Sequence, residues 1–262
     1  MHNPKLHAGL SIAAFVFAFA LGVPGCAIAQ DKDYTPSVGQ DGKDVIWVPT
    51  PQALVEKMLD MAKLTPKDIH YDLGSGDGRT VITAAKEGVS GKVKFIQGDI
   101  FETDFSKATV ITLYLLPSLN LKLRPTLLKM KPGTRVVSHA FTMEDWEADQ
   151  TENVEGRTAY LWIVPAPVEG TWRWNGSGSG PKEYQLKLRQ KFQKVEGEVE
   201  LDGRRGQLRD AKLNGDRLTF TVLDAGGVRR DFSGRVAGNS IQGVMKPLAG
   251  AGEAKWSASR AN

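Results

Sequence analysis

A glycine-rich segment, His70–Arg79, holds the residue types and spacing that are most specific for chemistry. It places an acid at Asp72 and glycines at positions 74, 76 and 78, between a predicted strand and a predicted helix. Glycines at alternate positions allow a tight turn and bring bare main chain close to a ligand. The first turn of the following helix offers unpaired N–H groups and a positive dipole end. The segment therefore suits a ligand that carries both an amino group, for the carboxylate, and an adenosine.

Other chemistries lack their residues in this chain. The single cysteine, Cys26, excludes a disulfide scaffold and a thiolate zinc cluster. No acid or histidine cluster has metal-ligand spacing, so no metal site is expected. The histidines His70 and His139 are expected to be structural, and no catalytic residue is assigned. The net charge of +4 is too small to indicate a nucleic-acid partner, and none is expected.

Around this segment, helical and strand-like patterns alternate along the chain. Apolar residues recur at helical spacing over 51–62, and helices are also predicted at 79–87 and 119–130. Strands are predicted at 68–73, 92–97, 108–116 and 134–141. Strands that alternate with helices indicate parallel pairing in an α/β sheet.

Several motifs between residues 45 and 165 resemble those of the class I S-adenosylmethionine-dependent methyltransferases. The nearest branch contains the lysine methyltransferase of the ATP synthase c-subunit. The segments that carry the resemblance are Val48-Pro49-Thr50-Pro51, Asp72-Leu73-Gly74-Ser75-Gly76-Asp77-Gly78-Arg79, Gly98-Asp99, Leu115-Leu116-Pro117-Ser118 and Lys131-Pro132-Gly133-Thr134-Arg135-Val136-Val137-Ser138. The resemblance implies a Rossmann-like fold that uses S-adenosyl-L-methionine to methylate an amine such as a protein lysine.

The resemblance also implies two groups of site residues. The cofactor would contact the residues Asp72, Gly74, Ser75, Gly76 and Asp99, of which Asp99 approaches the adenine amino group. The methyl-transfer pocket would be lined by Pro49, Thr50, Pro51, Leu116, Pro117 and Ser118.

One departure from the family pattern concerns the segment between the glycine loop and Asp99. Family members place a further strand and helix there, and that strand ends in an acid that binds the ribose hydroxyls. This chain runs from the first helix directly into the segment that ends at Asp99. By spacing, Asp99 could be the ribose acid, which usually lies about 20 residues beyond the loop. By its local Gly98-Asp99 motif it belongs on the adenine side, which we favour, so one strand–helix pair is expected to be absent.

The second half of the chain has a different pattern. Apolar and polar residues alternate over 183–192 and 217–222, with turn signals at Asn214-Gly215 and Gly238-Asn239. Short strands at regular spacing indicate an antiparallel meander, and closure into a barrel removes exposed strand edges. Its aromatic residues are expected to form the barrel core, with a ligand cavity as the alternative: Trp172, Trp174, Tyr184, Phe192, Phe220, Phe232 and Trp256.

The first thirty residues have the layout of a secretory signal peptide. Lys5 precedes an apolar run from Leu10 to Val23, and small residues lead to a cleavage site after Ala29. Lipid attachment at Cys26 is disfavoured because Pro24 fits that processing signal poorly. We expect an exported, periplasmic protein without a membrane span after cleavage, and its oligomeric state is not assigned.

The predicted fold is thus a truncated α/β Rossmann-like methyltransferase domain followed by a small antiparallel β-barrel domain. The predicted boundaries are a signal peptide over 1–29, the methyltransferase domain over 30–168 and the barrel over 169–262. The function indicated is methyl transfer to an amine; an acidic segment, Glu144–Asp149, could face a lysine substrate or be a solvated loop. The alternative is a non-catalytic envelope protein with a degenerate methyltransferase fold and a barrel that acts as a binding module.

Overall fold

A computed structural model describes residues 37–39, 46–88, 95–176, 180–247 and 252–261. The predicted signal peptide and its cleavage site lie outside the described residues. The predicted domain boundary at 168/169 stays a prediction; the last strand of the first sheet ends at Ile163 and the first barrel strand begins at Gly170. No helix in the described part of the chain has both the length and the apolar character needed to cross a bilayer.

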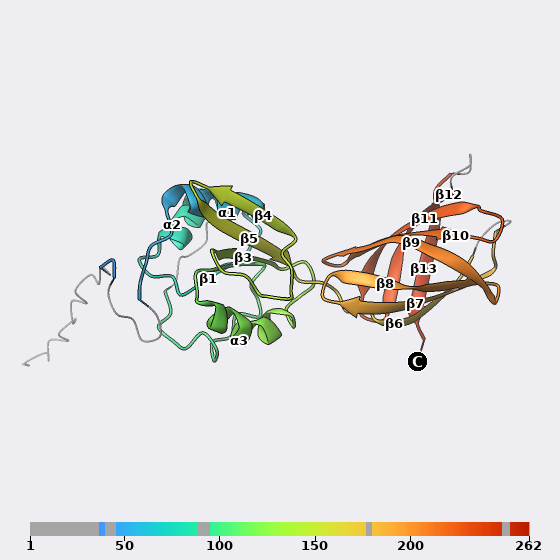
Figure 1. The fold of residues 1–262 in the computed structure, drawn as a ribbon, viewed down its shortest axis with the longest axis horizontal. Coiled ribbons are helices and arrows are strands. Elements are labelled where there is room, and N and C mark those ends of the chain that lie inside the picture. Colours follow the sequence, from blue (N-terminus) through green and yellow to red (C-terminus); the bar gives the residue numbers. More distant parts are fainter. Residues whose placement is uncertain (1–36, 40–45, 89–94, 177–179, 248–251, 262) are drawn as a thin grey trace, which may run out of the picture. The chain divides into compact units, whose positions relative to one another are not determined.

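The first half of the chain forms a five-stranded sheet in the order β1-β2-β3-β5-β4 (Figure 1). The strands are β1 (His70–Leu73), β2 (Val110–Leu113), β3 (Arg135–His139), β4 (Gln150–Val154) and β5 (Arg157–Ile163). The first three pair in parallel, as the alternating pattern predicted, and β5 joins them antiparallel to β3. The predicted Rossmann-like sheet is thereby confirmed, with an added hairpin, β4–β5, that the pattern did not reveal.

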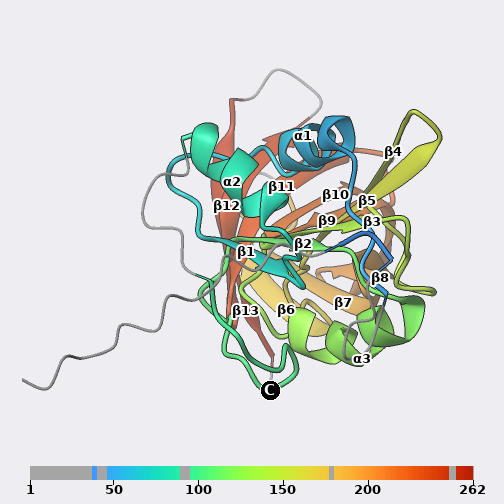
Figure 2. The ribbon, with the colours of Figure 1, turned by 90° about the vertical axis from the view of Figure 1, so that its left-hand side faces the viewer.

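Three helices cover the two faces of this sheet. They are α1 (Gln52–Met61), α2 (Arg79–Lys86) and α3 (Pro117–Leu127). Figure 2 shows α1 and α2 on one face and α3 on the other. The apolar stripe of α1, which includes Leu54, Met58 and Leu59, is buried. Because β1, β2 and β3 are parallel, their carboxyl ends lie at the same end of the sheet, where sites of such sheets usually lie.

The predicted strand at 92–97 is wrong in its described part. Residues 95–97 form no strand, and the described residues between α2 and β2 contain no regular element. Phe95 and Ile96 remain 59% and 58% exposed instead of pairing beside β1. Among the described residues β1 therefore pairs with β2 alone, which leaves its other edge open. This agrees with the expected loss of a strand–helix pair.

The second half forms a closed antiparallel barrel of eight strands, as predicted. These are β6 (Gly170–Asn175), β7 (Glu183–Lys191), β8 (Lys194–Leu201), β9 (Arg204–Asn214), β10 (Arg217–Leu223), β11 (Arg229–Ala237), β12 (Ser240–Pro247) and β13 (Ala254–Arg260). Gly215 and Gly238 occupy its turns with φ of 57°, the left-handed conformation that the turn signals require.

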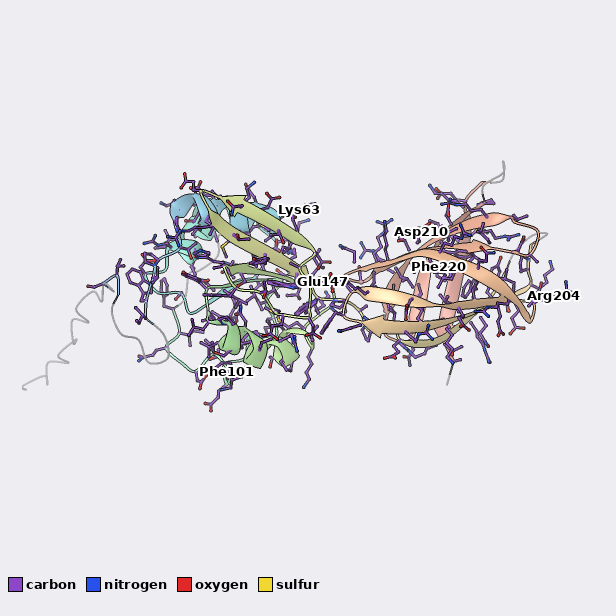
Figure 3. All side chains as sticks on the ribbon, viewed as in Figure 1. Lys63, Phe101, Glu147, Arg204, Asp210 and Phe220 are labelled. Carbon is purple, nitrogen blue, oxygen red and sulfur yellow. The ribbon has the colours of Figure 1, made fainter. Side chains whose placement is uncertain are left out.

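Aromatic rings fill the barrel. Trp174 stacks on Tyr184 at 4.8 Å between ring centroids, and Phe220 on Phe232 at 4.9 Å. Phe220 points into this interior in Figure 3. All but one of the aromatic residues considered in the sequence are buried in this core, as the core interpretation predicts. The exception is Phe192, which packs against the core of the first sheet.

Candidate functional site

Asp72 lies at the carboxyl end of β1 and is held by its neighbours on the sheet. Thr112 of β2 is its register partner, and Thr112 Oγ1 donates to Asp72 Oδ1 at 2.6 Å. His70 Nε2 lies 2.8 Å from the same hydroxyl. Since the threonine proton goes to the carboxylate, the hydroxyl oxygen accepts from the Nε2–H of a neutral His70. The three side chains form one hydrogen-bonded chain.

Burial shifts the ionisation of both titratable members of this chain. It raises the pKa of Asp72 to about 6; hydrogen bonds from Thr112 and Thr80 oppose the shift and the charge of Asp77 adds to it. Burial lowers the pKa of His70 to about 4, against the attraction of Asp68. At neutral pH the site therefore presents a carboxylate and an uncharged imidazole. A carboxylate of raised pKa in a cleft is a common mark of a functional site.

The glycine loop that follows has the backbone predicted for it. Gly74, Gly76 and Gly78 all have positive φ, at 83°, 56° and 76°. Gly78 caps α2, whose first residue, Arg79, forms an ion pair with Asp77 and donates to the carbonyl oxygen of Thr50 at 2.9 Å. The loop is thus tied to the segment that precedes α1.

Two of these glycines are covered by aromatic side chains of the protein itself. A Cβ at Gly76 would lie 2.2 Å from Nε1 of Trp47, and one at Gly78 would lie 2.7 Å from the ring of Phe95. The absence of a side chain at these positions therefore serves internal packing. The binding of cofactor by Gly76 stays a prediction.

An open cleft lies beside the other half of the loop. It has a volume of about 580 Å³, and its lining includes His70, Asp72, Gly74, Ser75, Phe95 and Gln97. Its lining also includes residues of β1 and of α2. Three predicted cofactor residues thus share one cavity.

Asp99 lies elsewhere in this loop region. Its side chain is exposed, and Oδ1 accepts from the N–H of Phe101 at 2.8 Å, while its neighbours Gly98 and Ile100 line the cleft. The adenine contact of Asp99 stays a prediction.

The predicted methyl-transfer segments lie at the ends of β2 and β3. Thr50, flanked by Pro49 and Pro51, is buried, and its Oγ1 lies 3.0 Å from Nδ1 of His139 at the end of β3. Leu116, Pro117 and Ser118 are exposed at the start of α3. A common pocket of the two segments stays a prediction.

Tyr114 packs beside His139 near these two segments and was missed in the sequence. Its ring lies 3.9 Å from that of His139 and 6.1 Å from that of Phe141, between centroids. Burial, with the positive charge of Arg157, lowers the pKa of His139 to about 4, so the ring is neutral. The available signal was position, because Tyr114 and His139 each stand at the carboxyl end of a parallel strand. No cluster of metal-ligating side chains occurs in the described residues.

Comparison with known proteins gives this geometry a family. The ANTKMT methyltransferase domain matches residues 84–150. A protein-lysine N-methyltransferase from Saccharolobus islandicus (strain REY15A) is 40% identical over 151 residues, which cover 46% of this chain and 94% of that protein. The lysine N-methyltransferase of the ATP synthase c-subunit from Rattus norvegicus is 26% identical, over 58% of this chain and 78% of its own length.

A solved structure is also similar, that of an RNA methyltransferase from Salinibacter ruber in complex with S-adenosyl-L-homocysteine. It is 46% identical, covers 46% of this chain and 96% of that chain, and superposes with a TM-score of 0.44. The family assignment depends on the sequence match to the Saccharolobus protein, which extends over nearly its whole length. The chain therefore belongs to this family of S-adenosylmethionine-dependent methyltransferases, as the motifs between residues 45 and 165 predicted.

Proposed function

We propose that this protein transfers a methyl group from S-adenosylmethionine to the side-chain amine of a lysine in another protein. The relatives named as protein-lysine methyltransferases support this choice of acceptor. The observation that carries the proposal is the cleft of about 580 Å³ that opens on Asp72, Gly74 and Ser75. Its lining combines a carboxylate, bare main chain and apolar walls, which fits the ammonium and adenosine ends of that cofactor.

The chain's residues would bind and orient the two reactants. Asp72 accepts the ammonium of the cofactor, and Thr112 and His70 hold the carboxylate in place. When bound, S-adenosylmethionine supplies a methyl group activated by a sulfonium. Tyr114 and Thr50 would orient the acceptor amine at the neighbouring strand ends. Alignment of this kind supplies most of the rate of such a transfer, so no covalent enzyme intermediate is needed.

We further propose that the protein is exported. The support is the basic start, the apolar run and the small residues before Gln30. Fractionation of producing cells and N-terminal sequencing test this: a periplasmic chain that begins at Gln30 is expected. A full-length chain retained in the cytoplasm would refute it.

A second candidate is a protein that has kept the fold without the activity. The rings of Trp47 and Phe95 against Gly76 and Gly78 favour it, because they cover main chain that a bound cofactor would be expected to contact. Isothermal titration with S-adenosylmethionine and S-adenosylhomocysteine separates the two candidates. Micromolar binding supports the enzyme, and absence of heat at millimolar ligand supports the second candidate.

The methyl acceptor needs a test of its own, separate from cofactor binding. We expect mass spectrometry to find an added methyl group on an acetylated pentapeptide with one central lysine. The matched control is the same peptide with arginine in place of lysine, which should stay unmodified. Transfer to neither peptide, despite cofactor binding, would contradict a lysine acceptor.

A further inference from the structure

The two-residue turn of the β7–β8 hairpin requires a backbone conformation that a phenylalanine rarely adopts. Lys191 pairs with Lys194, so Phe192 and Gln193 form a two-residue turn. Phe192 has a φ of 55°, in the left-handed region that bulky side chains rarely adopt and glycine adopts easily. Such strain persists where surrounding contacts hold it. The question is therefore what holds this phenylalanine.

Its ring packs against the methyltransferase sheet and not against the barrel. The Phe192 ring stacks on Trp146 with 5.9 Å between centroids and 22° between planes. The guanidinium of Arg124, from α3, lies 5.6 Å from the centre of the same ring. Trp146 is fully buried, and the partly buried Phe192 packs against the core cluster around it. The hairpin tip thus packs on the core of the first sheet.

Polar contacts surround this ring. The amide Nε2 of Gln193 donates to the carbonyl oxygen of Glu147 at 2.7 Å, and Lys194 forms an ion pair with the Glu147 carboxylate. Lys191 pairs with Asp145 at 3.3 Å. Figure 3 labels Glu147 in this region. Two lysines of the hairpin thus pair with acids of the segment 144–149, and the contact of this segment with a substrate lysine stays a prediction.

Among the contacts between the hairpin tip and the segment 145–147, the contact of the Phe192 ring should be the strongest. The paired lysine and acid side chains are all more than half exposed, and exposed ion pairs contribute little. The stack of the half-buried Phe192 ring on the buried Trp146, with the Arg124 cation near the same ring, contributes more. Phe192 should therefore dominate the contact.

The segment that the ring holds is tied in turn to α3. Arg124 donates to the carbonyl oxygen of Met143 at 2.9 Å and to Asp145 at 2.6 Å. The amide of Asn120, one turn after Pro117, reaches the carbonyl oxygens of Phe141 and Thr142 at 3.4 Å. The hairpin tip, the segment 141–149 and α3 thus form one connected set, and α3 begins with the predicted acceptor residues.

We propose that Phe192 is a positioning residue for the methyl acceptor: through Trp146 and Arg124, the barrel fixes the segment 141–149 and the start of α3. The proposal rests on the proposed function. It also makes the barrel a working part of the methyltransferase, on the acceptor side and not on the cofactor side.

The test replaces Phe192 by glycine in the full chain, which removes the ring while the turn keeps an easy positive φ. We expect the KM for the single-lysine peptide to rise about tenfold, the change implied by lost aromatic and cation–π contacts. We also expect kcat and cofactor affinity to stay within twofold, and amide hydrogens of 142–149 to exchange about tenfold faster. Phe192→Tyr should restore the peptide KM and the exchange rates of residues 142–149 to their wild-type values. Glu155→Gly is the matched control, since Glu155 has a φ of 52° in the β4–β5 turn.

Three results would overturn the proposal. The first is a Phe192→Gly variant with unchanged peptide KM and unchanged exchange of residues 142–149. The second is a loss of cofactor affinity in that variant as large as its rise in peptide KM, which marks a general structural role; the third is a Phe192→Tyr variant in which neither KM nor exchange returns to the wild-type value. If the wild-type protein methylates no peptide, the proposed function fails separately. The exchange rates of 142–149 in the glycine and tyrosine variants then decide the positioning role.

Discussion

Asp72 occupies a position that costs the unliganded protein stability. Its pKa of about 6 lies above the usual 3.8, so at pH 7.5 the folded state holds a charge that burial disfavours. A carboxyl group whose pKa is raised in the folded state stabilises the fold at pH values below its unfolded pKa of 3.8. This stabilisation is lost as the pH rises through the folded pKa of about 6. The structure keeps this charge where a ligand ammonium would compensate it.

We predict that Asp72→Asn stabilises the free protein and weakens cofactor binding. At pH 7.5 the free energy of unfolding should rise by on the order of 2 kcal/mol. Affinity for S-adenosylmethionine should fall at least about tenfold because a charged hydrogen bond is lost. Urea unfolding and isothermal titration measure the two effects. Asp104→Asn, at an exposed carboxylate that accepts from the N–H of Ser106, is the control and should change neither. Equal cofactor affinity in the Asp72 variant would contradict the assignment.

Thr50 has a structural role that can be separated from substrate contact. His139 is 1% exposed, and its Nδ1 lies 3.0 Å from the threonine hydroxyl. Thr50→Val should leave this nitrogen without a partner and lower the free energy of unfolding by about 1–3 kcal/mol. Thr50→Ser, which keeps the hydroxyl, should lose less. Denaturant unfolding gives both values, and a valine variant as stable as the wild type would refute the hydrogen bond.

At the scale of elements, the barrel depends on two facing glycines in β11 and β12. Gly234 and Gly243 are register partners. A Cβ at Gly243 would lie 1.9 Å from the carbonyl oxygen of Ser233, which is main chain and cannot rotate away. The strands approach closely here because neither partner carries a side chain.

We predict that Gly243→Ala lowers the free energy of unfolding by about 3 kcal/mol or more, because the backbone must shift. Gly252→Ala is the control, since nothing lies within 4 Å of a Cβ there. Tryptophan fluorescence during urea unfolding monitors Trp172, Trp174 and Trp256 in the barrel. If the two variants were equally stable, the close approach would not matter.

The sequence predicted elements whose patterns are local. Helix α1 follows from apolar spacing, and the barrel from alternation and from glycines in its turns. The hairpin β4–β5 was missed because β4 is largely exposed and has no apolar alternation. The predicted strand at 92–97 is wrong in its described part, where the ring of Phe95 packs against Gly78. Packing of this kind joins distant residues and leaves no periodic signal.

The candidate site was predictable where its residues lie in one local motif, and not where they contact distant parts of the chain. The motif located Asp72, Gly74 and Ser75, which the structure places in one cleft. It did not reveal that Trp47 covers Gly76, because a glycine required by a ligand and one required by a ring look identical in sequence. Tyr114 and Phe192 were missed or misplaced because their partners come from other elements.

For the whole molecule, buried histidines should set the response to acid. The pKa values of His70 and His139, each about 4, lie below the usual 6.5. Their stabilising contribution is present above 6.5 and is lost as the pH falls toward 4, because protonation then favours the unfolded chain. Protonation of Asp72 has the opposite effect, because it stabilises the folded state as the pH falls from 6 to 3.8.

We therefore predict a net loss of stability on the order of 3 kcal/mol between pH 7 and pH 4.5. His70→Gln, which can still donate to Thr112, should make this dependence shallower. Urea unfolding at the two pH values measures the slope for both proteins. A variant with the same slope as the wild type would show that His70 is not held neutral.

Among the described residues β1 has a hydrogen-bonded neighbour on one side only, and this has one more consequence. A strand with a hydrogen-bonded neighbour on one side opens more readily than strands enclosed on both. Asp72 and Gly74 thus lie on the margin of the sheet that should open most readily. If S-adenosylmethionine binds there as we propose, the cofactor would take the place of a neighbouring strand, and its binding should slow the opening of β1.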